Sequence, residues 1–301
     1  MSAASPVRET HHLTGDDAWR TLATTGRLKL LRDAFMRLRA ADGFSHARSL
    51  AFALSLVCVQ GLIALVGLAV ELGHTEFSRT VRDAISYAVP GPAGGLLERS
   101  FEQAQKVGLE HRSLPLVVGL VGTLVTAATA TGQLIRGFNR LYGIERDRTF
   151  VAKYTRALVL ALVVGAALIG AGAALTVGHH LSGGGPAGGD VAWRLLRWPV
   201  ALTLGAAAFG ALLRWAPQRR QPQWSWLVFG GAVGVAGCTI VTAAFSVAFR
   251  LSSSFGRVYG ALAGIVALQL WTFASAVAIF FGAAVAAQLE AVRSGTQPTR
   301  R

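Results

Sequence analysis

The chain is poor in charge, and the charge that it has is kept out of long apolar stretches. Only 15% of its 301 residues are Asp, Glu, Lys or Arg, whereas soluble domains average roughly 25%. A hydrocarbon core of about 30 Å requires about 20 apolar residues of helix. Six stretches of suitable length and composition cover about residues 50–72, 114–135, 157–178, 198–213, 226–249 and 261–289.

The alternation of apolar and polar residues that is typical of a membrane barrel is also lacking. Within lipid, only helices and closed barrels satisfy every backbone hydrogen bond. The sequence therefore predicts an all-α, polytopic membrane protein whose residues 42–290 form one domain of six transmembrane helices. The fourth stretch is short, and Trp198 and Pro199 are expected to begin it at an interface.

Sequence signs of catalysis or metal binding are missing. The two cysteines, Cys58 and Cys238, lie inside apolar stretches, where a thiol is usually a small buried side chain. The histidine pairs at 11–12 and 179–180 are adjacent in sequence, so their side chains do not share a helix face. No GxSxG, HExxH, Walker or dinucleotide-binding motif occurs in a valid context. We expect no enzyme activity, cofactor or bound metal.

Asp, Glu, Lys, Arg and His are absent from the interiors of the six stretches. This absence argues against a proton relay of intramembrane carboxylates. Gln60 in the first stretch and Gln269 in the sixth remain; they either bond between helices or contact a substrate. Two pairs spaced as GxxxG, Gly230 with Gly234 and Gly260 with Gly264, are candidates for close helix packing.

Acidic residues are scarce, and the net charge is +14. In a soluble protein this charge would suggest nucleic acid; here it favours contact with anionic lipid headgroups and no nucleic-acid partner. With the N-terminus inside, the inner segments hold 20 of the 29 Lys and Arg residues. This bias predicts that both termini are cytoplasmic. The first 49 residues hold eight Lys or Arg and no apolar core of a secretory signal.

The segments outside the six stretches have distinct patterns. We expect residues 1–26 to be a disordered cytoplasmic tail and residues 291–301 to be a second tail. Residues 27–41 predict a basic amphipathic helix that lies in the membrane interface or packs on the bundle. Its apolar stripe consists of Leu28, Leu31, Phe35 and Leu38, with Arg27, Lys29, Arg32, Arg37 and Arg39 around it.

The outer loop, residues 73–113, is the only long one, and long loops are often functional. It predicts two short amphipathic helices on or in the membrane surface, separated by Pro90-Gly91-Pro92. The glycine-rich residues 183–189 are expected to form a flexible link before the fourth span.

Arg136, Asn139 and Arg140 follow the second stretch at i, i+3 and i+4 and therefore share a helix side. Such a group can bind phosphate headgroups. It can equally act as a positive-inside stop signal.

Three segments of the chain resemble the YihY/BrkB family of bacterial inner-membrane proteins. They are GQLIRGFNRLYGIERDR at residues 132–148, LRWAPQRRQPQW at 213–224, and residues 254–290, which contain Tyr-Gly-x-Leu and Leu-Trp. The resemblance runs from about Arg32 to Glu290 and implies six transmembrane helices in the inner membrane. An older ribonuclease label has travelled with the family, and this sequence offers no catalytic group to support it.

Two positions depart from the family pattern. The last span of the family commonly ends in Gly-Ala-Glu-x-Asn, whereas Gly282-Ala283 is followed here by Ala284 and Ala286. The first span usually has a proline after Ser-Leu, whereas Ser55-Leu56 continues here as Val57. Family members have been linked to envelope integrity and to export of lipids or lipid-linked glycans. The resemblance implies translocation of an amphipathic envelope component, and the alternative is a membrane scaffold for envelope enzymes.

Overall fold

The structure, a computed structural model, describes most of the chain. The described ranges are residues 4–72, 81–83, 85, 89–110, 113–146, 148–176, 188–251, 259 and 262–296. Within these ranges, all regular structure is helical. This confirms the predicted all-α class.

In the described ranges, six helices are long and apolar enough to cross a membrane, which confirms the number predicted from the charge-poor stretches. They are α3 (Gly43–Leu72), α6 (Leu114–Leu141), α7 (Phe150–Thr176), α8 (Gly188–Trp215), α9 (Trp224–Leu251) and α11 (Ala263–Arg293). Several of them extend beyond the predicted ends, because polar residues at the membrane boundary still continue the helical backbone hydrogen bonds.

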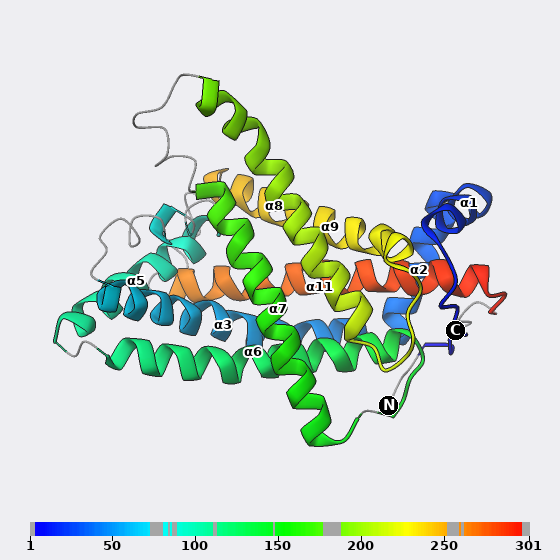
Figure 1. The fold of residues 1–301 in the computed structure, drawn as a ribbon, viewed down its shortest axis with the longest axis horizontal. Helices are drawn as coiled ribbons and strands as arrows, with labels where there is room; N and C mark the ends of the chain where they lie inside the picture. The colour runs from blue at the N-terminus through cyan, green and yellow to red at the C-terminus, as the bar shows by residue number, and fades with distance from the viewer. Residues whose placement is uncertain are drawn as a thin grey trace.

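Helix α11 lies at the centre of the bundle (Figure 1). It packs against α9 and α3, while α3 also pairs with α6, and α7 pairs with α8. In its most apolar stretch 56% of the residues are buried, a larger share than in any other span. The remaining spans therefore present most of their apolar surface to the surroundings, as membrane helices do.

Glycine allows two of these helix pairs to approach closely. A Cβ at Gly67 or Gly119 would overlap the backbone of the partner helix in the α3–α6 pair. In the α9–α11 pair, a Cβ at Gly230 would lie 2.6 Å from the Cβ of Ala286. A Cβ at Gly282 would lie 2.7 Å from the Cα of Gly234. Small residues bring membrane helices together in this way.

The second predicted glycine pair does not act as a pair in the described part of the structure. Gly264 lies at the start of α11 and faces α5 (Gly91–Glu110), where a Cβ would meet the Cβ of Leu96 at 2.7 Å. Gly260 lies outside the described residues.

The prediction of a disordered tail over residues 1–26 is wrong for residues 4–26. Ala4, Val7 and Leu13 are buried, and helix α1 (Gly15–Thr25) follows. The Thr14 backbone N–H and hydroxyl both donate to Asp17, at 3.3 and 3.2 Å, which caps the first turn. The composition of this segment is polar, but its few apolar side chains are held against the bundle. Residues 297–301 of the second predicted tail are outside the described part.

Helix α2 (Arg27–Ala40) matches the predicted amphipathic helix in its bounds but not in its buried face. The predicted stripe contributes only Leu38 to the buried side; Leu30, Ala34 and Arg37 complete it, and this face packs on α11. Leu28 is 84% exposed. The periodicity predicted one apolar stripe, whereas apolar residues also occur on a second side of the helix, and the bundle covers that second side.

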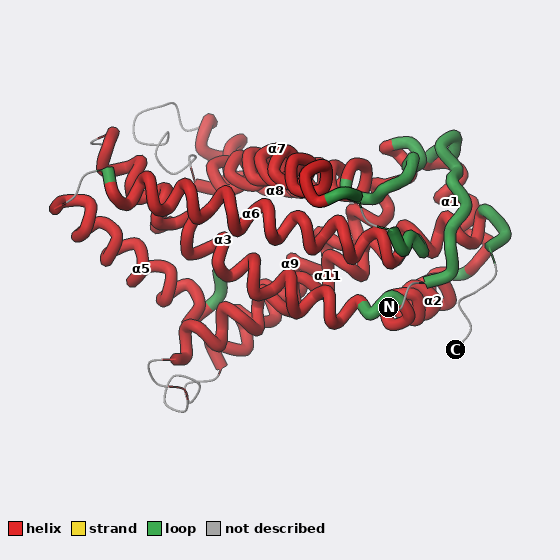
Figure 2. Tube along the Cα trace, turned by 90° about the horizontal axis from the view of Figure 1, so that it is seen from below, coloured by secondary structure: helices red, strands yellow, loops and turns green. Residues whose placement is uncertain are grey.

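The outer loop forms a helix within the bundle in its second half. The predicted second helix is α5, with Leu97, Phe101 and Ala104 buried, and it packs on α3 and α11 (Figure 2). It begins directly at the predicted break, because Gly91 has a φ of +54° and Pro90 precedes it. The first predicted helix lies largely outside the described residues, since 73–80, 84 and 86–88 are among those left out.

The fourth stretch of membrane-spanning composition begins at Leu195, close to the predicted start at Trp198 and Pro199, but the helix that contains it is longer. Helix α8 begins at Gly188 and continues through Pro199. Proline removes one backbone N–H from the helix, and membrane helices tolerate this where other groups compensate. Of the predicted flexible link 183–189, residues 183–187 lie outside the described ranges, as do residues 179–180.

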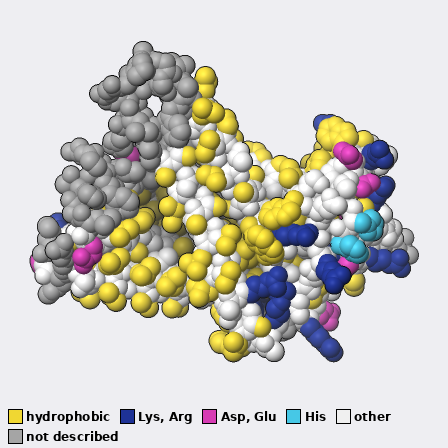
Figure 3. Space-filling model, in the orientation of Figure 1, with side chains coloured by type: hydrophobic (Ala, Val, Ile, Leu, Met, Phe, Trp, Pro, Cys, Tyr) yellow, Lys and Arg dark blue, Asp and Glu magenta, His cyan; other side chains and the backbone are white. Residues whose placement is uncertain are grey.

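Charge gathers at one end of the molecule, as Figure 3 shows: Lys, Arg, Asp, Glu and His side chains lie over α1 and the neighbouring segments, whereas apolar side chains cover the middle. We call this the terminal end, because residues 4–14, α1, α2 and the C-terminal end of α11 meet there. The opposite end, where α5 lies, is called the far end.

Candidate functional site

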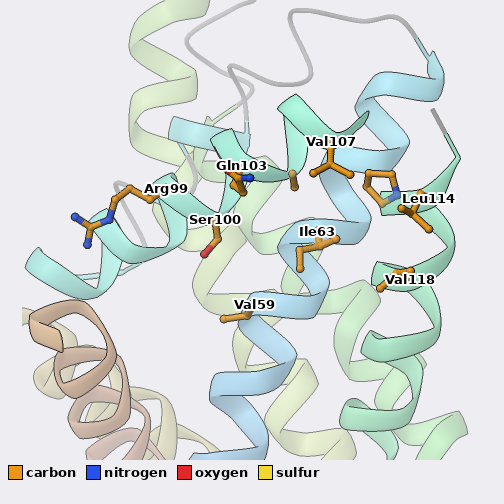
Figure 4. A pocket seen from close by; sticks show the side chains of 10 residues that line it. Val59, Ile63, Arg99, Ser100, Gln103, Val107, Leu114 and Val118 are labelled. Atoms are coloured by element: carbon orange, nitrogen blue, oxygen red, sulfur yellow. The ribbon is translucent and has the colours of Figure 1, made fainter. Parts of the chain in front are cut away.

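A pocket of about 580 Å³ lies near the far end, between α3, α5 and α6 (Figure 4). Its size falls within the range of about 300–1,000 Å³ typical of small-molecule sites. The side chains that line it come from all three helices: Val59 and Ile63 of α3, Arg99, Ser100, Gln103, Ala104 and Val107 of α5, and Leu114, Pro115 and Val118 of α6.

The polar and apolar parts of this lining are separated. Arg99, Ser100 and Gln103 occupy the first part of the α5 segment, and Val107 follows toward the start of α6 (Figure 4). The two walls below α5 are apolar. Leu114 and Val118 are about half exposed, so the pocket is open at the side of α6. A molecule with a polar head and an apolar tail matches this division.

The position of α5 creates the pocket. Its apolar face, with Leu97 and Phe101, packs with Leu62 and Val66 of α3 in one core cluster. The residues two and three positions after Leu97 and Phe101 therefore lie on the adjacent side of the helix. That side faces the space between α3 and α6. The guanidinium of Arg82 lies 5.1 Å from the centre of the Phe101 ring and adds a cation–π contact on the outer side.

The two intramembrane glutamines lie in different settings. The Oε1 of Gln269 accepts a hydrogen bond of 2.8 Å from the Ser55 hydroxyl, which joins α11 to α3. The Oε1 of Gln60 is buried next to Gly122 of α6 and has no hydrogen-bond partner within the described residues. Gln60 lies beside Val59 of the pocket lining, but it does not itself line the pocket.

Arg136, Asn139 and Arg140 do not present one common face to the surroundings. Arg136 is exposed, so its contact with headgroups stays a prediction. Asn139 is fully buried, and its Oδ1 accepts a hydrogen bond of 2.8 Å from the backbone N–H of Gln218. Arg140 is buried and donates to the Ile144 carbonyl at 3.0 Å. Asn139 thus joins the end of α6 to the segment after α8, and Arg140 holds the turn that directly follows α6.

A cluster of buried polar side chains fills the terminal end. We call Arg37, Tyr142, Arg219, Gln288 and Glu290 the terminal polar cluster. Arg219 and Glu290 form an ion pair of 2.6 Å, with 3% and 0% of their side chains exposed. The Thr10 hydroxyl donates to the same Glu290 oxygen at 2.5 Å, which ties the N-terminal segment to α11.

Arg37 links four segments from within this cluster. Its Nε donates to Gln288 of α11 at 2.8 Å, and its Nη1 donates to the carbonyls of Ser5 and Leu141 at 3.0 Å each. Burial lowers the pKa of Arg37 to about 10, although Tyr142 and Glu290 oppose that shift. The side chain therefore remains charged at neutral pH.

Tyr142 is a buried aromatic side chain of the cluster that packs against Arg219. The guanidinium of Arg219 lies 4.7 Å from the centre of its ring. Burial raises the pKa of the Tyr142 hydroxyl, and the negative charge of Glu290 raises it further, so the phenol stays neutral at physiological pH.

In the described part of the chain, no three His, Cys, Asp or Glu side chains are grouped to hold a metal ion.

Sequence reasoning missed both the pocket lining and the terminal polar cluster. The sequence pattern places Arg37 among the basic residues around the apolar stripe of its helix, and it indicates no role for Glu290, which follows the sixth apolar stretch. One feature of the sequence could have indicated the cluster: Glu290 directly follows a long stretch without charge. A carboxylate that is buried there needs a partner of opposite charge. The partner, Arg219, is 71 positions away and has no local pattern that identifies it.

Comparisons with known proteins agree with the membrane architecture. The family model described as virulence factor BrkB matches residues 34–301. The ribonuclease-like protein YfkH of Bacillus subtilis is 23% identical over 272 residues, which cover 87% of this chain and 95% of that protein. UPF0761 membrane proteins of Chromohalobacter salexigens and Nitrosospira multiformis are 26% and 28% identical. The chain spans 65% and 61% of their lengths. No solved structure matches.

Proposed function

From the premise that this chain belongs to the BrkB virulence-factor family, we propose that it binds an amphipathic component of the bacterial envelope and moves it across the inner membrane. The observation that carries the proposal is the divided lining of the far-end pocket, with Arg99, Ser100 and Gln103 on one part and an apolar remainder. The proposed substrate is a lipid or lipid-linked glycan with an anionic head.

The apolar part of the pocket accommodates the acyl chain in this proposal but contributes little to the affinity. Each methylene group transferred from water contributes about 0.8 kcal/mol, but a chain that is already in the bilayer gains little from a second apolar site. Selectivity must then come from the head, through the charge of Arg99 and the hydrogen-bonding groups of Ser100 and Gln103. An arginine suits a phosphate or carboxylate head because its planar donors bind two oxygens at once.

The proposed orientation places the terminal end in the cytoplasm. Basic residues of tails and inner loops favour that side, and Figure 3 shows Lys and Arg gathered there. The pocket is then in the outer half of the membrane, where a component bound for the envelope would be released.

A role as a scaffold receives less support from α5. This helix uses its apolar face within the bundle and leaves Glu98, Glu102 and Lys106 exposed. A partner would therefore meet a mixed-charge surface without the buried aromatic or aliphatic anchors that dominate protein interfaces.

The experiment that tests the proposal is mass spectrometry of lipids retained by the protein in mild detergent, compared with the bulk membrane. Arg99→Gln removes the charge at the pocket, and Val118→Trp fills the apolar part. Lys106→Gln is the matched control, because Lys106 is also an exposed cation on α5 but does not line the pocket. We expect one lipid class to be enriched, to be lost in the first two variants and to persist in the control. A retained profile that equals the bulk membrane in all four proteins would overturn the pocket as a substrate site.

A further inference from the structure

Helices α1 and α2 leave large apolar side chains on the outside of the terminal end. Trp19 of α1 is 57% exposed, and Leu28, Leu31 and Phe35 of α2 are 84%, 37% and 42% exposed. Leu28, Leu31 and Phe35 follow one another at i, i+3 and i+7 and therefore form one stripe. Together with the basic side chains described below, we call this surface the α1–α2 collar.

The collar continues two surfaces that face the lipid. Phe35 makes an edge contact with Phe44 at the start of α3, with ring centres 6.1 Å apart. Further along α3, Phe52 is 62% exposed inside a helix of membrane-spanning length. The ring of Trp19 lies 6.4 Å from that of Phe229 on α9. Aromatic contacts thus connect α1 to α9 and α2 to α3 at the ends of these spans.

Basic side chains flank the apolar stripe of α2. Lys29, Arg32 and Arg39 are exposed, and by the helical period they lie on the side of the stripe that is remote from α11. The opposite side of the helix is fixed, because Leu30, Ala34 and Arg37 are buried against the bundle. The helix is therefore held at its place along the spans rather than free to rotate.

The level of the collar matches a membrane boundary. Arg48 is exposed on α3 between Phe44 and Phe52, and Trp215 and Trp224 are 42% and 45% exposed where α8 ends and α9 begins. Tryptophan is enriched at headgroup level in membrane proteins. A stripe of apolar residues beside cations at that level is the pattern of an interfacial helix.

We propose that the α1–α2 collar is a binding surface for anionic lipid headgroups, with its apolar stripe inserted among the acyl chains and Lys29, Arg32 and Arg39 on the phosphates. An isolated exposed stripe would be an interaction site for some partner in any protein. Here its continuity with the lipid-facing sides of α3 and α9 identifies the bilayer as that partner. This inference does not depend on transport by the far-end pocket.

The first test measures the depth of α2 in nanodiscs. Spin labels are placed by Leu28→Cys, Leu31→Cys and, as the control on the other side of the helix, Asp33→Cys, in a chain that carries Cys58→Ala and Cys238→Ala. We expect labels at 28 and 31 to collide more with dissolved oxygen than with a water-soluble nickel complex, and the label at 33 to show the reverse. Water-like collisions at all three positions would overturn the proposal, as would protection of 28 and 31 from both reagents by a second copy of the chain.

The second test measures lipid preference. The protein is placed in mixed phosphatidylcholine and phosphatidylglycerol, and the lipids bound to it are weighed by native mass spectrometry. The double variant Lys29→Gln/Arg32→Gln is compared with Arg8→Gln/Arg220→Gln, which removes two exposed charges of the terminal end outside the collar. We expect the preference for phosphatidylglycerol to fall about fivefold per charge removed from the collar and little in the control. An equal fall in both would show that only total charge matters.

Discussion

At the scale of the residue, the terminal polar cluster decides whether the ends of the chain stay on the bundle. Arg219 and Glu290 are buried as a pair, and a buried charge without its partner is far more costly than the pair itself is valuable. The contacts of Thr10 with Glu290 and of Arg37 with Ser5 extend this dependence to the N-terminal segment.

The expected consequence is that Glu290→Ala lowers the free energy of unfolding by about 3–5 kcal/mol, because Arg219 is left buried and unpaired. The double variant Arg219→Met/Glu290→Leu should lose less than the single one, since it removes both charges. Thermal unfolding in detergent measures the difference. Arg293→Gln is the control: it breaks an exposed pair with Asp17, and such pairs contribute about 0–1 kcal/mol. A loss in Glu290→Ala no larger than in the control would contradict the role of the buried pair.

Single residues also show where sequence reasoning stops. Arg136 and Arg140 are four positions apart and chemically identical, yet the first is exposed and the second is buried. Their spacing placed them correctly on neighbouring turns. The difference arises from the chain segment that crosses the end of α6, which a local pattern does not contain.

At the scale of the element, glycine sets the distance between α9 and α11. Gly230→Ala would place a Cβ 2.6 Å from the Cβ of Ala286 and 2.8 Å from the carbonyl oxygen of Gly282. Because both neighbours belong to a packed helix, the helices must separate, and overpacking of this kind costs about 1–3 kcal/mol.

Gly165→Ala on α7 is the matched control, because a Cβ there meets nothing within 4 Å. Alanine is the better helix former by up to about 1 kcal/mol, so this variant should be as stable as the parent or more so. Both variants are compared by thermal unfolding in the same detergent. Equal melting temperatures would show that the α9–α11 contact tolerates a wider spacing.

Helices are predictable from the sequence where they cross the lipid bilayer. Each of the six spans was found because a bilayer leaves apolar residues no alternative to a helix. Helix α2 was found from its period, but its buried face was not, since apolar residues occur on two of its sides. Helix α8 begins at Gly188, ten residues before the predicted start of the fourth span, because the less apolar residues that precede the span still continue the helix.

At the scale of the whole molecule, the terminal end and the far end lie at opposite ends of the helix bundle, and the predicted orientation places them on opposite sides of the membrane. We expect a cysteine introduced by Thr24→Cys on α1 to react with a membrane-impermeant maleimide only in inside-out vesicles. One introduced by Glu102→Cys on α5, outside the pocket lining, should react in intact cells with a permeabilised outer envelope. Both positions are exposed, and Cys58 and Cys238 are replaced by alanine beforehand. Labelling of both positions from the same side would contradict the predicted orientation of the bundle.

The sequence by itself determined the all-helical class, the number of spans and the charge bias between the two sides. Each of these follows from local composition, because the bilayer acts on every segment independently. The tertiary structure alone decided that α11 is central and that α5 contributes Arg99 and Gln103 to the lining of a pocket. It also decided that Arg37, Arg219 and Glu290 lie together in one buried cluster. These arrangements depend on contacts between segments that are far apart in the chain, and the energy of such contacts exists only once the helices have packed.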